Sequence, residues 1–475
     1  MELRALLESR AASSRYVDPW TGLPYPASGT QGKEFDEGPT NPKALVRTFG
    51  RPESEIRVKL YRDHAAWCPY CHKVWLQLEE KRIPYRIEKI NMRCYGDKPP
   101  SFTAKVPSGL LPVLELDGRI ITESEVIMLT LEREFPDHRP LLPPENDSPL
   151  RTRATQLMRL ERSMFSRWLN WLCSDFNQVS HKRVFEEGLA LVEKALEESG
   201  GPFFLDTSDS PSMVDLVFAP FLERMCASLL YYKGYRMRGE GKYPALERWF
   251  VAMEARDTYV GTRSDHYTHC HDLPPQLGGC GLVEDGIPFA AAIDGLVPTS
   301  WRLPLPPLGP QSLEAYTATT TSKTGTDDDD DKEEEKEEDL HERLEAASRM
   351  IANHEALVSF ACRGAGKKGS KPVGAPLSDP TAQPNNEVQL EVDAALRHVV
   401  HGLIVGVDAK QQQGASALRS VKVTELKEFD PALLDGQPVG PCLAYLRDRV
   451  GVPRDMRFPA ARQLRAHLNW VADSV

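Results

Sequence analysis

Residues 56–90 read IRVKLYRDHAAWCPYCHKVWLQLEEKRIPYRIEKI, and this stretch decides the fold. Residues 57–62 alternate polar and apolar side chains, as a half-buried strand does, and end at a loop that leads into Cys68. The apolar residues between Val74 and Ile83 fit about three turns of helix, which Pro84 ends. Residues 85–90 predict a second strand. The stretch therefore predicts a strand–helix–strand unit with a CxxC motif at its first junction.

Two further strands and a helix complete the same domain. Residues 111–116 and 119–121 flank the turn Asp117-Gly118 and predict a hairpin, and residues 124–135 predict a helix. The order β-α-β-β-β-α, with the CxxC motif at the first strand–helix junction, is typical of a thioredoxin-like domain. The predicted fold class is therefore an α/β thioredoxin-like domain followed by all-α domains.

Changes in composition divide the rest of the chain. A Pro-rich break at 140–149 precedes a region with helical periodicity, in which Ser212 and Asp215 have the spacing of an N-capping box. The N-terminal residues, rich in Pro, Gly and polar side chains, predict an irregular arm or a disordered leader. The predicted units are the arm 1–54, the thioredoxin-like domain 55–142, an all-helical domain 150–262, an extended irregular segment 263–326, an acidic linker 327–339, and a helical C-terminal extension 340–475 with a flexible insertion 364–386.

Charge and composition exclude several classes of protein. The net charge is −11, but residues 327–339 carry −9 of it, so the remainder is close to neutral and lacks the basic surface that nucleic acid requires. No apolar run approaches the ~20 residues that span a bilayer, and the first residues do not read as a secretory signal. Nine widely spaced cysteines predict a reducing compartment, the cytoplasm or alternatively the chloroplast stroma.

Cys68 is the candidate catalytic nucleophile. It would stand just before the first turn of a helix, where unpaired backbone N–H groups and the helix dipole stabilise a thiolate over a thiol. Pro69 suits the first helical position, because the N–H that it lacks would have no partner there. Cys71 falls on the same helical face but deeper. We therefore expect Cys68 to attack and Cys71 to be available as a resolving thiol.

A zinc site and a purely structural pair are the alternatives for these cysteines. A structural zinc ion takes four ligands, usually from two pairs, and the sequence has no second CxxC motif nearby. His64 and His72 flank the pair without the required spacing. We therefore expect a redox role and no bound metal.

A second signal, independent of the cysteines, predicts a site for a peptide with an amino acid head group. Pro112 stands just before a strand, where a cis bond would expose the N–H and C=O of Leu111 to an extended peptide. Ser124 opens a helix whose amides and hydroxyl suit a carboxylate, and Glu123 suits an ammonium group. Glutathione offers such a head group in its γ-glutamyl residue. An ordinary helix start is the alternative for Glu123 and Ser124.

An aromatic stripe gives a weaker signal. Phe165, Trp168 and Trp171 recur every three residues on the first long helix of the helical domain. Core packing explains such a stripe more often. The alternative is the lining of a second-substrate pocket that faces Cys68, joined by Tyr231 or Tyr232.

The remaining histidines and cysteines predict no further site. His266, His269 and His271 cluster with Cys270, and we expect packing between domains rather than a metal site. The other six cysteines are expected to be buried small apolar residues: Cys94, Cys173, Cys226, Cys280, Cys362 and Cys442.

On these residues the chain resembles the glutathione transferase superfamily over residues 56–262. The motifs that carry the resemblance are Cys68-Pro69-Tyr70-Cys71, Leu111-Pro112-Val113-Leu114, Thr122-Glu123-Ser124, Ser212-Met213-Val214-Asp215 and Pro220-Phe221-Leu222-Glu223-Arg224. Residues 92–98, 105–109, 265–267, 277–280, 353–356 and 445–456 resemble the iota class of photosynthetic organisms, whose members carry a helical extension. Members often have Trp where this chain has Tyr70, so the CPYC motif is also the glutaredoxin one.

The resemblance implies a set of site residues. Cys68 would face the glutathione sulfur, with Cys71 beside it. The residues implied to contact glutathione are Pro69, Tyr70, Lys98, Lys105, Leu111, Pro112, Glu123 and Ser124, where Lys98 and Lys105 are alternatives for the glycyl carboxylate. The second-substrate pocket would hold Phe165, Trp168 and Tyr232.

The implied function is a glutathione-dependent thiol transferase or reductase, acting in deglutathionylation or dehydroascorbate reduction through a Cys68–glutathione mixed disulfide. Glutathione is the expected co-substrate, a disulfide or glutathionylated molecule is the second substrate, and a homodimer is compatible with the resemblance. Two alternatives stay open. One is a non-enzymatic glutathione-binding or regulatory scaffold, and the other is an iron–sulfur protein whose cluster glutathione and Cys68 ligate.

Overall fold

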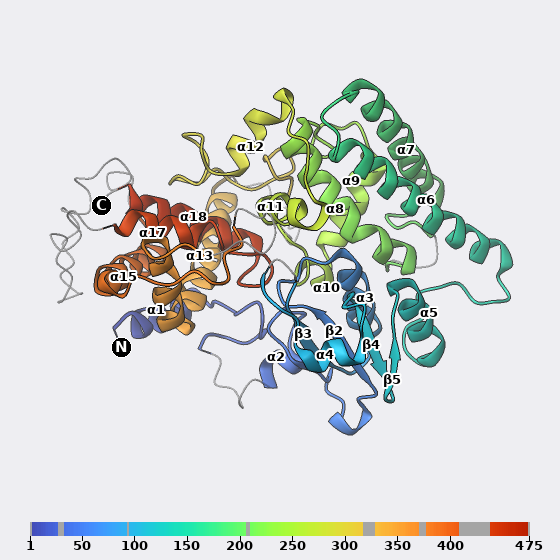
Figure 1. Ribbon diagram of the computed structural model, residues 1–475, viewed down its shortest axis with the longest axis horizontal. Helices are drawn as coiled ribbons and strands as arrows, with labels where there is room; N and C mark the ends of the chain where they lie inside the picture. The colour runs from blue at the N-terminus through green and yellow to red at the C-terminus, as the bar shows by residue number, and fades with distance from the viewer. Residues whose placement is uncertain are drawn as a thin grey trace.

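The computed structural model describes residues 2–26, 33–92, 95–205, 210–316, 328–369, 377–407 and 438–473, and for Ser148 and residues 328–338 the backbone alone. Figure 1 shows a domain built on a sheet, a helical domain beside it, and a second helical bundle that contains both the first and the last described helix. Within the described ranges, no helix is long and apolar enough to cross a membrane.

The first domain has the predicted thioredoxin-like fold. Its sheet has the strand order β1-β3-β2-β4-β5, in which β2 and β3 are parallel and the other neighbours antiparallel. Leu60 of β2 is in register with Ile87 of β3 and Leu114 of β4. The strands are β1 Val46–Arg47, β2 Val58–Asp63, β3 Tyr85–Ile90, β4 Val113–Leu116 and β5 Arg119–Ile121, and the helices after β2 are α3 Pro69–Lys81, α4 Pro100–Lys105 and α5 Ser124–Glu134.

Helix α3 is buried on almost all sides. It contacts β2 and α5 of its own domain and α8 and α10 of the helical domain. Its charged residues Glu79, Glu80 and Lys81 are buried as well, because each is paired with a residue of a neighbouring segment. The N-terminal end of α3, where Cys68 lies, is therefore at the interface between the two domains.

The N-terminal arm is not irregular throughout, and this part of the prediction is wrong. Its first residues form α1 Glu2–Ser13, which packs against α13 and α15 of the C-terminal bundle. Further along, α2 Lys33–Glu37 is followed by β1, which extends the sheet at β3. Only Leu7 and Ala11 of α1 are fully buried, so its helical state depends on packing that the local pattern does not reveal.

The helical domain contains α6 Ser148–Leu172, α7 Gln178–Ser199, α8 Met213–Lys233, α9 Pro244–Glu254 and α10 Asp257–Val260. The predicted capping box at the start of α8 is present, with Ser212 and Asp215 bonded reciprocally. Asp215 also accepts hydrogen bonds from the Phe204 N–H at 3.0 Å and the Trp249 indole N–H at 2.9 Å. Every residue of α8 is buried, so α8 is the central helix of the domain.

The described part of segment 263–326, residues 263–316, is more ordered than the sequence predicts. It contains α11 His266–Leu277 and α12 Ile287–Ile293. The Asp265 carboxylate caps α11 by accepting from the Thr268 N–H at 3.0 Å, and Pro274 and Pro275 lie inside this helix. The two prolines hide the helix from a pattern-based prediction, because proline usually marks a break.

The C-terminal bundle has its own hydrophobic core, which includes Leu7 and Tyr16 of the N-terminal arm. The backbone of the acidic run is helical and continues into the bundle, and residue 327 and the acidic side chains of 328–338 lie outside the described residues, as do residues 370–376 of the insertion. A loop separates the last two helices of the bundle. The helices are α13 Asp328–Ala352, α14 His354–Ala361, α15 Gln389–Val405, α17 Val439–Arg447 and α18 Phe458–Ala472.

Buried polar contacts join this bundle to α11 and to Asp265, which precedes α11. Arg465 and Asp265 form an ion pair in which each side chain is 1% exposed. The Tyr267 hydroxyl donates to the carbonyl of Asp448 at 3.2 Å, and the Val452 N–H donates to the Thr268 hydroxyl at 3.3 Å. The bundle therefore packs directly against α11 and is not attached to the other domains by a linker alone.

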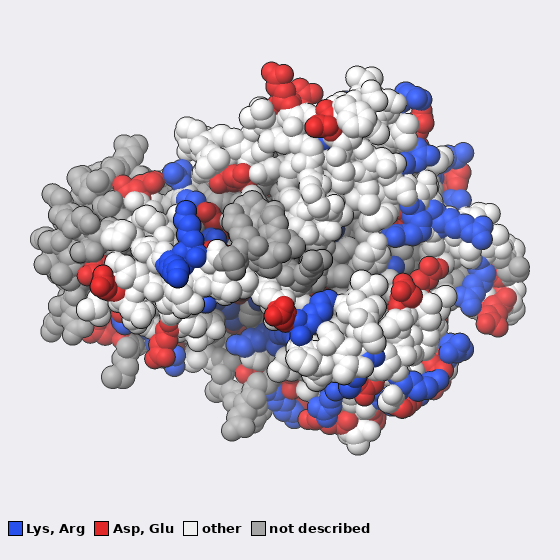
Figure 2. Space-filling model, in the orientation of Figure 1, with Lys and Arg blue, Asp and Glu red and all other residues white. Residues whose placement is uncertain are grey.

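Charged side chains of both signs are interspersed on the face shown in Figure 2. They are dense over the thioredoxin-like domain and along α6 and α7, whereas the surface over α9 and α12 is mainly uncharged. This mixture agrees with the near-neutral charge of the chain outside residues 327–339.

Asp265→Asn should destabilise the protein strongly, because it leaves the Arg465 guanidinium buried without a counter-charge. We expect the free energy of unfolding to fall by about 3–5 kcal/mol. The matched control is Asp117→Asn, which breaks the exposed Arg57–Asp117 pair and should cost less than about 1 kcal/mol. Urea denaturation followed by tryptophan fluorescence measures both. Equal, small losses would contradict the docking of the bundle through this pair.

Candidate active site

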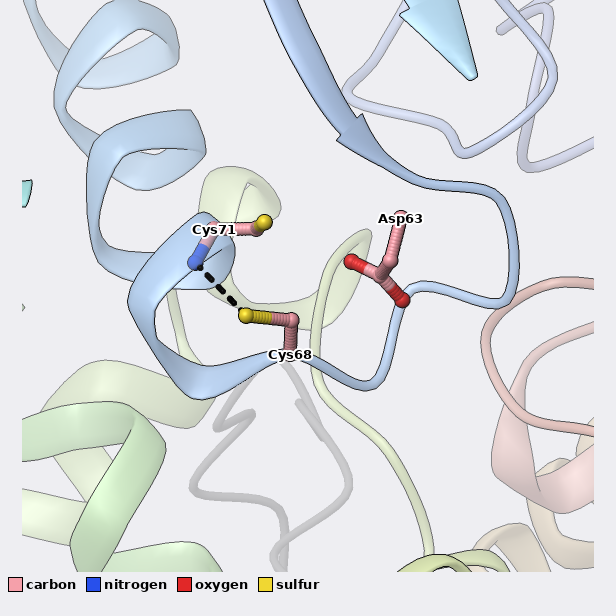
Figure 3. A group of neighbouring side chains, drawn as sticks. All are labelled: Asp63, Cys68 and Cys71. Atoms are coloured by element: carbon pink, nitrogen blue, oxygen red, sulfur yellow. Dashed lines mark hydrogen bonds between the residues drawn. The ribbon is translucent and has the colours of Figure 1, made fainter. Parts of the chain in front are cut away.

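Cys68 occupies the N-cap position of α3, at the end of the loop that leads from β2 (Figure 3). The Cys71 N–H donates to Cys68 Sγ at 3.4 Å, and Pro69 is in the first turn. The sulfur therefore receives one of the backbone amides that a helix start leaves unpaired, in the positive field of the helix dipole. Cys68 is 7% exposed, so only a small part of it is in contact with solvent.

Cys71 and Asp63 lie beside Cys68, and both are buried. Burial raises the pKa of the Cys71 thiol well above its ordinary value, and Cys68 and the Asp63 carboxylate add to the shift, so Cys71 is held protonated. Asp63 Oδ2 accepts from the Trp67 N–H at 2.6 Å, whereas Oδ1 has no hydrogen-bond partner among the described residues. Asp63 ends the strand that precedes the CxxC motif, and an acid at this position was the sequence signal for this neighbour, which was not predicted.

These three side chains are also the residues that could hold a metal ion. Their ligand atoms lie within 4.8 Å of one another. A carboxylate and two sulfurs would supply three ligands to zinc, one fewer than a structural zinc site takes from protein.

The Leu111–Pro112 bond is cis, as the sequence analysis predicted. The carbonyl oxygen of Leu111 lies 3.9 Å from Cys68 Sγ and accepts from its thiol. Leu111 precedes β4, so the CxxC helix and the start of β4 meet at the nucleophile.

Lys98 and Lys105 differ in where their ammonium groups lie. Lys98 Nζ donates to the carbonyl of Gly109, two residues before Leu111. Lys105 Nζ instead binds the Tyr61 hydroxyl at 3.0 Å and Glu115 Oε2 at 3.2 Å. Lys98 is therefore the one held beside the loop that carries Leu111, a distinction that the sequence left open.

Glu123 and Ser124 form the start of α5. Glu123 has φ 64° and ψ 112°, a conformation that costs a non-glycine residue of the order of 1–3 kcal/mol. Its side chain is exposed and makes no capping hydrogen bond, while Ser124 is buried. A strained backbone with a free carboxylate is a common sign of a ligand-binding position.

Of the three residues predicted for a second-substrate pocket, Phe165 lies near the CxxC helix. Its ring centroid is 5.3 Å from that of Phe221, which in turn is 5.6 Å from that of Tyr70. The Arg162 guanidinium lies over the Phe165 ring at 4.7 Å and over the Tyr70 ring at 5.8 Å. An aromatic surface with one cation thus borders the helix that carries Cys68.

Trp168 and Tyr232, the other two residues predicted for the pocket, are buried in the helical domain. The Trp168 side chain is 1% exposed and its indole N–H donates to the Ser228 hydroxyl at 2.9 Å. The Tyr232 hydroxyl donates to the carbonyl of Cys270 on α11 at 2.7 Å. Trp171 and Tyr231 are buried as well, so the stripe is mainly core packing, the more frequent explanation for such a pattern.

Two regions of the chain match known protein families. Residues 67–134 match "Glutathione S-transferase, N-terminal domain" and residues 158–252 match "Glutathione S-transferase, C-terminal domain". The chain is 30% identical over 198 residues to Glutathione S-transferase DHAR2 of Arabidopsis thaliana. This match covers 42% of this chain and 84% of the Arabidopsis protein.

This chain belongs to the glutathione S-transferase family. It is 31% identical over 233 residues to Glutathione S-transferase omega-1 of Mus musculus, with 48% of this chain and 85% of the mouse protein covered. Among solved structures, glutathione transferase Omega 3C from Trametes versicolor is 28% identical, with a TM-score of 0.38 over 44% of this chain and 90% of that one. The protein is thus an enzyme that uses glutathione. Its C-terminal extension lies outside the two regions that match the family.

A buried polar network of this transferase supports the residue before the nucleophile. Arg224 of α8 is 1% exposed and donates to the carbonyl of Trp67. Its other amino group pairs with Glu223 at 2.9 Å. Glu223 Oε1 also lies 3.3 Å from His72 Nδ1 and 3.3 Å from His269 Nε2. His269 therefore belongs to packing between domains, as predicted for the histidine cluster, while the role of Arg224 was not anticipated.

The network keeps a carboxylate charged in the interior. Burial alone would raise the pKa of Glu223, but His72 and His269 hold it well below its usual range. The pKa of His269 is raised, because Asp272 and Glu223 outweigh its burial and the nearby Arg224. Burial lowers the pKa of His72, which Glu223 opposes only in part. The ionised Glu223 in turn holds the Arg224 guanidinium against the Trp67 carbonyl.

The C-terminal bundle also approaches the active-site loop. A cleft of about 320 Å³ has His64, Trp67 and Tyr95 on one side and residues 448–451 with Arg454 on the other. The Tyr95 ring packs edge-on against Trp67 at 4.7 Å, and the charge of Arg454 helps to lower the pKa of His64, after burial. The bundle thereby forms a wall beside the loop that precedes Cys68.

Arg224→Met should slow the alkylation of Cys68 by iodoacetamide about tenfold at neutral pH, equivalent to ~1.4 kcal/mol. The variant removes a buried cation and the hydrogen bond that fixes the Trp67 carbonyl, so the loop that positions Cys68 at the start of α3 is held less firmly. Peptide mass spectrometry of the Cys68 peptide over time measures the rate. Arg224→Lys should restore part of it, and Arg236→Met, on a guanidinium that binds the Ser312 carbonyl, should leave it unchanged. A normal rate in folded Arg224→Met would contradict this role.

Proposed function

We propose that this transferase is a glutathione-dependent thiol transferase or reductase that works through a mixed disulfide between Cys68 and glutathione. The observation that carries the proposal is a cysteine at the N-cap of α3 whose sulfur accepts the N–H of Cys71. A serine or tyrosine at this position would stabilise the thiolate of glutathione for attack on an electrophile. A cysteine becomes the nucleophile itself and forms a disulfide.

The proposed glutathione site uses the residues that surround Cys68. The backbone of Leu111 would pair with the cysteinyl unit of glutathione, as an added strand does. The α5 amides and Ser124 would hold the γ-glutamyl carboxylate, and the Glu123 carboxylate its ammonium group. Lys98, held at the Gly109 carbonyl, is our choice for the glycyl carboxylate. Pro69, Tyr70 and Pro112 would complete the lining of the glutathione site.

The proposed reaction is a pair of thiol–disulfide exchanges. The Cys68 thiolate attacks the glutathione sulfur of a mixed disulfide R–S–SG, which forms Cys68–S–SG and releases R–S⁻. The thiolate of a second glutathione then attacks the glutathione sulfur, which restores the Cys68 thiolate and releases glutathione disulfide. In the alternative second step, the Cys71 thiolate attacks the Cys68 sulfur, forms a Cys68–Cys71 disulfide and releases the glutathione thiolate. Because burial keeps Cys71 protonated, we propose the route through a second glutathione as the main one.

The second substrate that we propose is a glutathionylated thiol or dehydroascorbate. It would approach Cys68 past Tyr70, Phe165 and Arg162, where an aromatic surface and a cation lie together. Trp168 and Tyr232 have no part in this proposal, because both lie in the core.

Four finer statements complete the proposal. The helical extension supports a place in the iota class, although the chain has Tyr70 where members of that class often have Trp. We propose a cytoplasmic protein, with the chloroplast stroma as the alternative, and a homodimer. The domain limits 55–142 and 150–262 are proposed as those of the glutathione-binding and helical domains.

Cys68→Ser should abolish thiol transfer in the hydroxyethyl-disulfide assay, with a loss of about a thousandfold or more, because serine cannot form the mixed disulfide. Cys71→Ser should retain most of the activity by the route through a second glutathione. Cys173→Ser, on an exposed cysteine, is the matched control and should be active. After incubation with oxidised glutathione, mass spectrometry should find the adduct on Cys68. An active Cys68→Ser variant would refute the mechanism, and an inactive Cys71→Ser variant would show an obligatory dithiol cycle.

Lys98→Met should raise KM for glutathione about tenfold, the effect of losing ~1.4 kcal/mol of binding to a carboxylate. Lys105→Met should change KM by less than about twofold, because that ammonium group is bound to Tyr61 and Glu115 instead. Steady-state kinetics with varied glutathione compares the two variants. The opposite order would assign the glycyl carboxylate to Lys105.

A further inference from the structure

Cys173 and Cys280 lie on two segments that are in contact at the surface of the helical domain. Cys173 is the C-cap residue of α6, and Cys280 follows α11 by three residues. The Gly281 N–H donates to the carbonyl of Leu172 at 2.8 Å. A Cβ placed on Gly281 would lie 2.6 Å from the carbonyl oxygen of Ser174. The residues on both sides of Cys173 therefore touch the residue next to Cys280.

Lys233, the last residue of α8, joins the same two segments. Its ammonium group donates to the carbonyl of Ser174 at 2.5 Å and to the carbonyl of Gly281 at 2.6 Å. One cation is thus shared between the residue after Cys173 and the residue after Cys280.

These contacts limit the distance between the two cysteines. The Leu172 oxygen is one peptide unit from the Cα of Cys173, and the Gly281 nitrogen is one peptide unit from the Cα of Cys280, so the two Cα atoms are at most about 8 Å apart. A disulfide spans about 4.4–6.8 Å between Cα atoms. Gly278 and Gly279 precede Cys280, and a Cβ at either would meet no atom within 4 Å, so the chain is not tightly packed at these two residues.

The exposure of the two thiols separates them from other cysteines of the chain. Cys173 is exposed and Cys280 is half-buried, which corrects the expectation that both are buried apolar residues. Cys226, Cys270, Cys362 and Cys442 are buried, as expected, and Cys94 lies outside the described residues. An oxidant in solution can therefore reach Cys173 directly.

The two thiols also influence each other. Burial raises the pKa of both, and in Cys280 the charge of Cys173 adds to burial and brings the pKa to about 12. The Lys233 ammonium lowers both pKa values in part. Cys173 is therefore the first of the two to react. Once its sulfur is in a neutral disulfide, the part of the Cys280 pKa rise that comes from the charge of Cys173 is removed, while the larger part that comes from burial stays.

We propose that Cys173 and Cys280 are a second redox-active thiol pair of this protein, which glutathione disulfide converts into an intramolecular disulfide. The Cys173 thiolate attacks glutathione disulfide, which forms Cys173–S–SG and releases one glutathione thiolate. The Cys280 thiolate then attacks the Cys173 sulfur, forms the Cys173–Cys280 bond and releases the second glutathione thiolate. The pair loses two protons and two electrons, and one glutathione disulfide becomes two glutathiones. The proposal does not depend on the chemistry of Cys68.

The disulfide would link the C-terminal end of α6 to the segment that follows α11. Helix α11 holds the C-terminal bundle through Tyr267 and Thr268. Because the link closes a long loop of the chain, oxidation should raise the midpoint of thermal unfolding by several degrees.

The test uses the full-length chain with Cys68→Ser and Cys71→Ser, so that the active-site thiols cannot contribute and failure of the proposed function leaves the result unaffected. The protein is incubated with oxidised and reduced glutathione at a series of ratios, blocked with iodoacetamide and digested. We expect a peptide that joins Cys173 to Cys280, 2 Da lighter than the two thiol peptides together and absent after reduction. Adding Cys280→Ser should trap Cys173–S–SG, whereas adding Cys442→Ser should leave the cross-link unchanged.

Three results would overturn the proposal. They are free thiols at both positions in glutathione disulfide alone, stable glutathione adducts on both cysteines without a cross-link, and a cross-link found only between chains on a non-reducing gel. Circular dichroism of the Cys280→Ser variant checks that its fold is intact, so that the loss of the cross-link reports on the thiol.

Discussion

The contact between α3 and α8 is the constraint on which the active site depends. Helix α3 must be buried on the sheet to complete the thioredoxin-like domain, and its N-terminal end must stay open to present Cys68. Helix α8 covers α3 and supplies Arg224, whose guanidinium holds the Trp67 carbonyl immediately before the nucleophile. The buried carboxylate of Glu223 offsets the charge of Arg224, and His72 of α3 and His269 of α11 surround it. One polar network thus holds the loop before the nucleophile and connects the two domains with α11.

The same network extends the influence of the C-terminal bundle to the active site. Helix α11 carries His269 on one side and the contacts to residues 448–452 on the other. The N-terminal arm adds a second connection, because α1 packs in the bundle while β1 pairs with the sheet. The bundle is therefore packed against the rest of the protein at two places. The bundle is better described as a third layer of the enzyme.

The chain contains two thiol pairs in contrasting surroundings. Cys68 and Cys71 are enclosed at the domain interface, where the Cys68 sulfur accepts a hydrogen bond at the start of α3 and burial keeps Cys71 protonated. Cys173 and Cys280 lie at the surface on segments joined by Lys233. The first pair suits turnover, because one sulfur is always the nucleophile. The second suits a slower response to the ratio of oxidised to reduced glutathione.

The sequence by itself determined the elements that form through interactions between residues close together in the chain. The strand before Cys68, the CxxC helix, the hairpin after Pro112, the cis bond and the capping box at Ser212 were predicted from local patterns, because the interactions that form them span only a few residues. Tertiary structure alone decided the choice of Lys98 over Lys105, the burial of Trp168 and Tyr232, the helix α11 around Pro274, and the places of Arg224 and Cys280. Each of these depends on a partner far away in the chain, and neither periodicity nor spacing within a segment carries that information.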